Sequence, residues 1–172
     1  MDATALQNKI DQAFRILSRP TSFTTCRCDE CFLLDSVLQS KDYNTLAATD
    51  VGMSLCLISP EGMTYWIPAL VRLCLTGDRD QWCEACDHFI KSELGLSLPK
   101  MDFPCQHPRF ASLNPEQTAL VLEFLKHIEA SWYTKDRQEA PRELARAIRN
   151  WSRFAGVNLE SKESTAKRDE SI

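Results

Sequence analysis

The chain has 172 residues, of which 44% are hydrophobic and 26% are charged. This length allows one domain that buries roughly 70% of its unfolded surface, and the apolar content excludes a disordered chain. The longest strongly apolar stretch, 63–75, is too short to span a bilayer and contains Arg72. The amino-terminal residues show no basic region followed by an apolar run, so we expect a globular cytoplasmic protein without a membrane segment or signal peptide.

The net charge of −4 is unevenly distributed. A mildly acidic chain is unsuited to coating nucleic acid with a broadly basic surface. Residues 135–153, however, hold six basic and three acidic side chains, so this segment carries +3 and the remainder carries −7.

Apolar residues at helical spacing predict the first helices. The first runs over 5–18 and ends at Arg19-Pro20, because the residue before a proline leaves the helical region. Residues 21–27 are expected to be extended, with at most one short strand. A second helix starts near Asp29 and should bury Phe32, Leu33, Val37 and Leu38. A third covers about 46–57, weakened by Gly52.

Capping signals mark the later helices. Ser59-Pro60 predicts a helix start, and the helix that follows, to about Leu75, is apolar nearly all round and therefore central. Pro68 inside it should produce a kink. Further helices are expected over 78–94, from Asn114-Pro115 to about 133, and from 140 to Gly156, with a long loop over 95–113.

These elements predict an all-α fold. We expect a single compact domain of six or seven helices with little or no sheet, formed by residues 1–157. Residues 158–172 mix charges with Ser and Thr and lack apolar periodicity, so we interpret them as a flexible charged tail.

Eight cysteines stand in the chain. Without an export signal, a disulfide framework is not expected. Cys56 and Cys74 lie within apolar helical patterns and are predicted to be small buried residues.

Three cysteines are concentrated where a loop enters the second helix: Cys26, Cys28 and Cys31. A helix amino terminus lowers a thiol pKa, and zinc binds deprotonated sulfur in a tetrahedral set of four. The cluster therefore predicts a structural zinc site. The further ligands would come from Cys83 and Cys86, three residues apart on one helix face, or from His88, Cys105 or His107.

Two other interpretations of these cysteines stay open. They are ordinary reduced residues, or Cys28-x-x-Cys31 performs thiol redox chemistry. The sequence contains no glycine-rich phosphate loop and no carboxylate pair that stands out as an acid and a base, so we assign no catalytic residue.

Four arginines, Arg142, Arg146, Arg149 and Arg153, fall within a band of about 60° on the last helix. Leu144, Ile148, Trp151 and Ala155 lie on the opposite side. Arginine binds carboxylate or phosphate through its planar fork, so this face would bind an acidic protein or a nucleic-acid backbone. The alternative is a solvated helix face partly offset by nearby glutamates.

Several motifs together resemble a family of small bacterial proteins of unknown function. They are Cys28-x-x-Cys31, the segment Ser59-Pro60-Glu61-Gly62-x-x-Tyr65-Trp66-Ile67-Pro68-Ala69-Leu70, and the helix start Asn114-Pro115-Glu116-Gln117. The resemblance covers about 26–133 and leaves the first and last helices outside. It implies no activity that could be transferred to this chain.

These observations lead to a functional hypothesis. We expect a non-enzymatic helical protein that binds another macromolecule, a protein in the first instance, with an immunity-type or antitoxin-type role as one example. The alternatives are a thiol redox enzyme or sensor using Cys28 and Cys31, and nucleic-acid binding through the arginine face.

Overall fold

The computed structural model describes residues 2–52, 54–76, 84–95, 110–134 and 142–169, and for 132–134 and 157–169 it describes the backbone only. The all-α prediction is confirmed, because seven α-helices and no strand occur in this part of the chain. Short 3₁₀ and π segments adjoin them. The α-helices are α1 (Ala3–Phe14), α2 (Asp29–Gln39), α3 (Ala48–Val51), α4 (Pro60–Thr76), α5 (Glu84–His88), α6 (Pro115–Ile128) and α7 (Arg142–Asp169).

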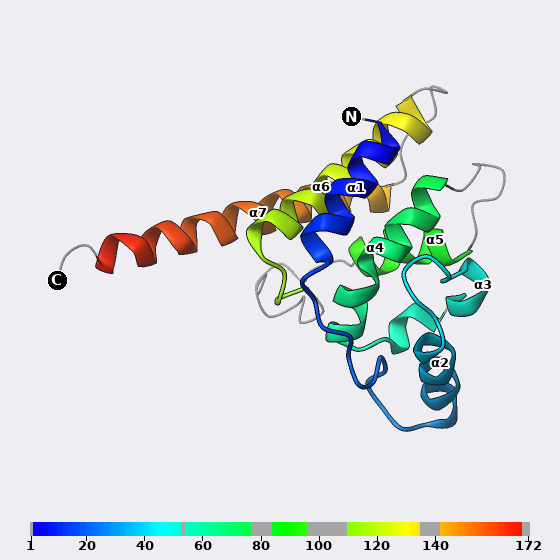
Figure 1. Cartoon of the computed structure of the whole chain (residues 1–172). Coiled ribbons are helices and arrows are strands. Elements are labelled where there is room, and N and C mark those ends of the chain that lie inside the picture. The colour runs from blue at the N-terminus through cyan, green and yellow to red at the C-terminus, as the bar shows by residue number, and fades with distance from the viewer. Residues whose placement is uncertain (1, 53, 77–83, 96–109, 135–141, 170–172) are drawn as a thin grey trace.

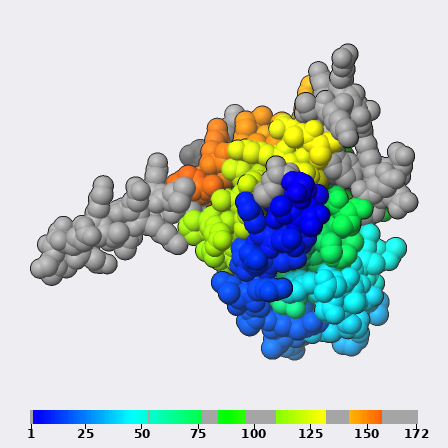
Figure 2. Space-filling model, turned by 45° about the horizontal axis from the view of Figure 1, so that its top comes forward, coloured from blue at the N-terminus to red at the C-terminus, as the bar shows by residue number. Residues whose placement is uncertain are grey.

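Helix α4 is the centre of the arrangement (Figure 1). Helix α1 packs against both α4 and α6, and Figure 2 shows it lying across the face that these helices form. Helix α7 packs on α6 and on the π-helical segment Phe89–Leu94 that continues α5. Helix α2 contacts α3 at the edge of the molecule, so it has far less protein around it than α4.

The start of α4 follows the sequence prediction. The Ser59 hydroxyl accepts a hydrogen bond from the Gly62 amide at 3.0 Å, which satisfies one free N–H of the first turn. A Cβ atom on Gly62 would lie 2.7 Å from the Phe23 carbonyl oxygen, so only glycine allows the 21–27 segment to approach so closely. Trp66 is fully buried, as expected of a helix that is apolar on every side.

Helix α6 begins at the predicted capping box. The Asn114 side chain accepts from the Gln117 amide at 2.9 Å, and the Gln117 side chain accepts from the Asn114 amide at 3.0 Å. The Gln117 side-chain amide also donates to the Ala13 carbonyl at 3.0 Å, which ties the end of α1 to the start of α6.

The predicted helix over 46–57 is divided. Gly52 adopts a positive φ of 45° and ends α3, and a 3₁₀ segment, Ser54–Leu57, follows. Left-handed backbone is accessible to glycine at little cost, so the residue that was expected to weaken one helix separates two short ones. Cys56 lies in the second and is exposed, contrary to the prediction that it is buried, whereas Cys74 in α4 is buried as expected.

Other boundaries also differ from the predictions. Helix α7 continues beyond Gly156 to Asp169, because a glycine inside a helix costs only about 1 kcal/mol relative to alanine and does not by itself end it. The helix expected over 78–94 is described from Glu84, and most of the expected loop lies outside the described residues. In place of a short strand near 21–27 there is one isolated bridge between Thr24 and Ile58.

Candidate functional site

The segment before the cysteine cluster is fixed by backbone hydrogen bonds. The Phe23 amide donates to the Asp35 carboxylate of α2 at 2.5 Å, and the Phe23 carbonyl accepts from the Ser59 amide at 2.7 Å. The Thr25 amide donates to the Leu57 carbonyl at 3.2 Å. Phe23 itself is fully buried, so the chain arrives at Cys26 from a defined direction.

The three cysteines converge at the amino terminus of α2. Cys28 is the residue immediately before the helix and Cys31 lies in its first turn. The Cys26 Sγ atom lies 3.0 Å from the Cys28 Sγ and 3.0 Å from the Cys31 Sγ, and all three Sγ atoms lie within 4.8 Å of one another. Cys26 and Cys28 are exposed and Cys31 is buried, so the cluster opens to solvent on one side.

The pKa values of the Cys26 and Cys31 thiols are shifted in opposite directions. Hydrogen bonding with Cys28 and with Cys31 lowers the pKa of the Cys26 thiol. The pKa of Cys31 is raised to about 11, because its hydrogen bond to Cys26 and its burial both favour the neutral thiol. The shifts therefore favour a thiolate at Cys26 over one at Cys31.

This donor set fits a thiophilic metal. Thiolates bound to one zinc ion at about 2.3 Å in tetrahedral geometry lie roughly 3.8 Å apart. Two Sγ separations in the cluster are 3.0 Å, and all three lie within 4.8 Å, so each is within about 1 Å of that value. Two of the three side chains are exposed and free of close packing, so small rotations would bring the sulfur atoms to metal-binding distance.

The other predicted ligands do not join this cluster within the described part of the chain. Cys86 is buried on α5 and is not among the grouped donors. His88 instead faces Glu93, with 3.2 Å between its Nε2 and the carboxylate. Cys83, Cys105 and His107 lie outside the described residues. The described chain thus supplies three of the four ligands of a tetrahedral site.

The buried face of α2 is not the predicted one. Phe32, Leu33 and Val37 are 71%, 65% and 36% exposed, although all three were expected to be buried. The buried residues are Cys31, Leu34 and Leu38, and of these only Leu38 was predicted. Their i, i+3, i+7 spacing makes this face as plausible as the predicted one once Cys31 is counted as an apolar residue.

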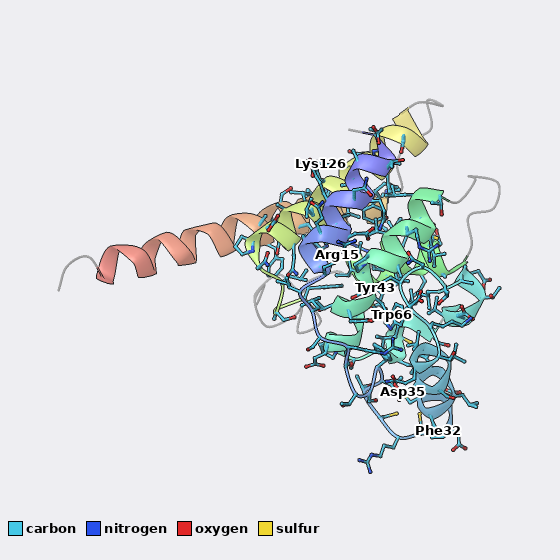
Figure 3. All side chains as sticks on the ribbon, in the orientation of Figure 1. Arg15, Phe32, Asp35, Tyr43, Trp66 and Lys126 are labelled. Carbon is cyan, nitrogen blue, oxygen red and sulfur yellow. The ribbon has the colours of Figure 1, made fainter. Side chains whose placement is uncertain are left out.

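Arg19 holds the other end of α2. Its guanidinium donates to the carbonyl oxygens of Leu38 and Gln39 at 3.0 and 2.8 Å, and to that of Lys41 at 3.0 Å. Leu38 and Gln39 belong to the last turn of the helix, where carbonyls have no amide partner four residues on, and Lys41 lies just beyond it. Together with the bond between Asp35 and Phe23, these bonds hold the carboxyl-terminal half of a helix whose outer face carries exposed apolar side chains. Figure 3 places Phe32 at the edge of the molecule and Trp66 near its middle.

Three of the four arginines on the arginine face of α7 are exposed. Arg142, Arg149 and Arg153 are exposed, whereas the Arg146 guanidinium donates to the Gly95 carbonyl at 2.9 Å. Arg146 therefore ties α7 to the end of the π-helical segment. Leu144 and Trp151 on the opposite side are buried, as the amphipathic pattern predicts.

A cavity of about 430 Å³ lies between the 17–22 segment and α4. Most of its polar side chains are hydroxyls, and Glu61 is the carboxylate among the residues that line it. Hydroxyls around a single carboxylate do not provide an acid and a base, so this cavity suggests no catalytic reaction.

None of the described helices combines the length and the hydropathy that crossing a bilayer requires. No curated protein and no solved structure matches the chain. One family model matches residues 29–161. The match begins after Cys26 and Cys28 and includes most of α7, which the sequence comparison above had left outside the resemblance. Since more than half of the residues are matched, the chain belongs to the family of unknown function DUF6714.

Proposed function

We propose that the protein is a non-enzymatic binding protein that recognises another protein through the outer face of α2. One observation carries this proposal: Phe32, Leu33 and Val37 are large apolar side chains, and on a rigidly held helix they are 71%, 65% and 36% exposed. Clustered apolar residues on a surface mark interaction sites more often than isolated ones do.

The anchoring of α2 supports this interpretation. An isolated helix of 11 residues is marginally stable in water. Arg19 and Asp35 hold α2 in place through hydrogen bonds to backbone groups at its carboxyl end and on the neighbouring 21–27 segment. A surface that is ordered before binding loses less conformational entropy when a partner docks.

Substitution of the apolar face tests this function. We expect Phe32→Ser/Leu33→Ser to lose a partner that the unmodified chain captures from its host, and to lose binding to that partner once it is purified. Ile16→Ser is the matched control, because Ile16 is also an exposed aliphatic residue, at 76%, but lies outside α2. Equal affinity of both variants for the purified partner would contradict the proposal.

The second part of the proposal is a structural zinc ion held by Cys26, Cys28 and Cys31. The ion would link the 21–28 segment to the first turn of α2 and so fix the start of the binding helix. Because metal binds the folded site, zinc would add to the free energy of unfolding, by about 2.7 kcal/mol at a free concentration one hundred times its dissociation constant.

Metal analysis of protein purified without added metal tests the zinc site. We expect zinc in the unmodified chain and its loss in Cys26→Ser/Cys28→Ser/Cys31→Ser. Cys56→Ser is the control, because Cys56 is exposed but lies outside the cluster. Cys83→Ser, analysed in parallel, tests the fourth ligand. Zinc content that is equal in the triple variant and the unmodified chain would overturn the site.

A thiol redox function is the second candidate, and the sulfur geometry favours it around Cys26. The Cys26 Sγ atom lies 3.0 Å from both neighbouring sulfur atoms, so Cys26, in place of the predicted Cys28 and Cys31 pair, is the shared partner. This function predicts that metal-free protein is alkylated fastest at Cys26, because the thiolate is the nucleophile. Equal and slow alkylation of Cys26 and Cys56 would exclude it.

A further inference from the structure

The outward face of α7 contains small residues beside its arginines. Ala145, Ser152 and Gly156 lie within about 80° of Arg142 around the helix axis, on one side of the arginine face. Ser152 and Gly156 are exposed, and a Cβ atom on Gly156 would meet nothing within 4 Å. This face therefore presents a row of small residues along one side of its arginines.

The outer face of α2 has the opposite character. Its large apolar side chains follow Asp29 and Glu30 along the helix, and these two exposed carboxylates take part in none of the ion pairs among the described residues. Bulky side chains can pack closely on a surface of small residues, and carboxylates pair with arginines. The two helices are thus complementary in side-chain size and in charge.

The two faces belong to different parts of one chain. Helix α7 packs on α6 and the π-helical segment, whereas α2 packs on α3. Figure 1 shows α2 at one edge of the molecule and α7 leading away from the body on another side. The two outward faces can therefore meet only when α2 of one molecule reaches α7 of another.

We propose that the partner of the α2 face is a second copy of this chain, whose α7 receives Phe32 and Leu33 on its small residues and Asp29 and Glu30 on its exposed arginines. This inference rests on the proposed binding role of α2 and identifies the partner that binds its outer face.

The helical spacing of the two faces agrees with this pairing. Arg149 and Arg153 are four residues apart, or about 6 Å along the axis, and Asp29 and Phe32 are three residues apart, or about 4.5 Å. One arginine can pair with the carboxylate while the next stacks on the aromatic ring. The arginine stems provide further apolar contact for Leu33.

Sedimentation equilibrium of the purified chain, in reducing buffer without chelator, tests the pairing. We expect concentration-dependent association that weakens as salt is raised, because exposed charges are screened. Asp29→Lys/Glu30→Lys and Arg149→Glu/Arg153→Glu should each lower the association constant by more than about tenfold, since each brings like charges together.

Mixing the two charge-reversed variants is the decisive measurement. Each variant repels copies of itself, but α2 of the first is complementary to α7 of the second, and the unaltered faces also match. We expect the equimolar mixture to associate as the unmodified chain does. A monomeric unmodified chain, or a mixture that stays monomeric, would overturn the inference.

Gly156→Leu distinguishes a blocked α7 surface from a misfolded protein. Leucine favours helix over glycine, so the variant should be at least as stable as the parent while its association is lost. Ile16→Ser should associate normally. If the unmodified chain is monomeric while Phe32→Ser/Leu33→Ser still loses a host partner, the binding role of α2 stands and only the second-copy inference fails.

Discussion

Helices α4 and α2 are both rich in large apolar residues, but the structure places them in opposite environments. Helix α4 is surrounded and its Trp66 is fully buried, while α2 lies at the edge with Phe32 mostly in solvent. Their apolar content alone would have predicted two buried helices. An apolar pattern therefore identifies a helix, whereas the elements packed around that helix decide how many of its faces are buried.

The two helices also depend on different interactions. Helix α4 is held by apolar packing from several directions, including ring contacts of Trp66 with Phe23, Tyr43 and Tyr65. Helix α2 is held on one apolar face and by polar groups, Arg19 and Asp35, that bind backbone atoms. Substitutions in the two helices should therefore differ in size and kind.

The largest effect is expected in α4. Trp66→Ala should lower the free energy of unfolding by about 3–5 kcal/mol, because it removes a fully buried side chain and leaves a cavity. Urea unfolding measures this loss. Trp66→Phe is the control: it keeps most of the apolar volume and removes an indole N–H that pairs with no described residue, so it should cost less. Equal losses in both variants would contradict the packing argument.

Removing the anchor between α2 and the 21–27 segment should have a smaller effect. Asp35→Ala leaves the Phe23 amide without its acceptor, which we expect to cost about 1–3 kcal/mol in urea unfolding. Ser36→Ala is the neighbouring control, because Ser36 is exposed on the outer face. Asp35→Asn keeps an acceptor oxygen and should recover part of the loss; no recovery would argue against this role.

Removing the Arg19 side chain from the carboxyl end of α2 should lower the free energy of unfolding by less than Asp35→Ala does. Arg19→Ala removes hydrogen bonds to three carbonyls, but the side chain is exposed, so we expect about 1 kcal/mol. Faster amide hydrogen exchange in α2 than in α4 would locate the effect. Arg19→Lys lacks the planar guanidinium that binds several carbonyls at once, so it should recover little of the lost stability. Full recovery by lysine would show that charge alone matters.

Much of the fold follows from local chemistry. Ser59 and Pro60 fix the start of α4, and Asn114 and Gln117 fix that of α6, because each satisfies backbone groups within its own turn. The convergence of the three cysteines is equally local, since all three lie within six consecutive residues. Such features need no knowledge of the rest of the chain.

The rest of the fold depends on contacts between segments that are distant in the sequence. The sequence does not show that Asp35 is needed by the Phe23 amide, that Arg19 reaches the end of α2, or that Arg146 binds the Gly95 carbonyl. Since Asp35 and Arg19 decide how α2 is oriented, the choice between its two apolar faces could not be made from periodicity alone.

The smallest effect on stability is expected at the exposed face of α2. Phe32→Ser removes a side chain that is 71% exposed, so the free energy of unfolding should change by no more than about 0.5 kcal/mol. The same substitution should abolish recognition through α2, which sedimentation of the purified chain measures directly. A large loss of stability would mean that Phe32 is buried like Trp66, and the contrast between the two helices would disappear. An unchanged stability with lost association would show that α2 keeps its second apolar face for binding.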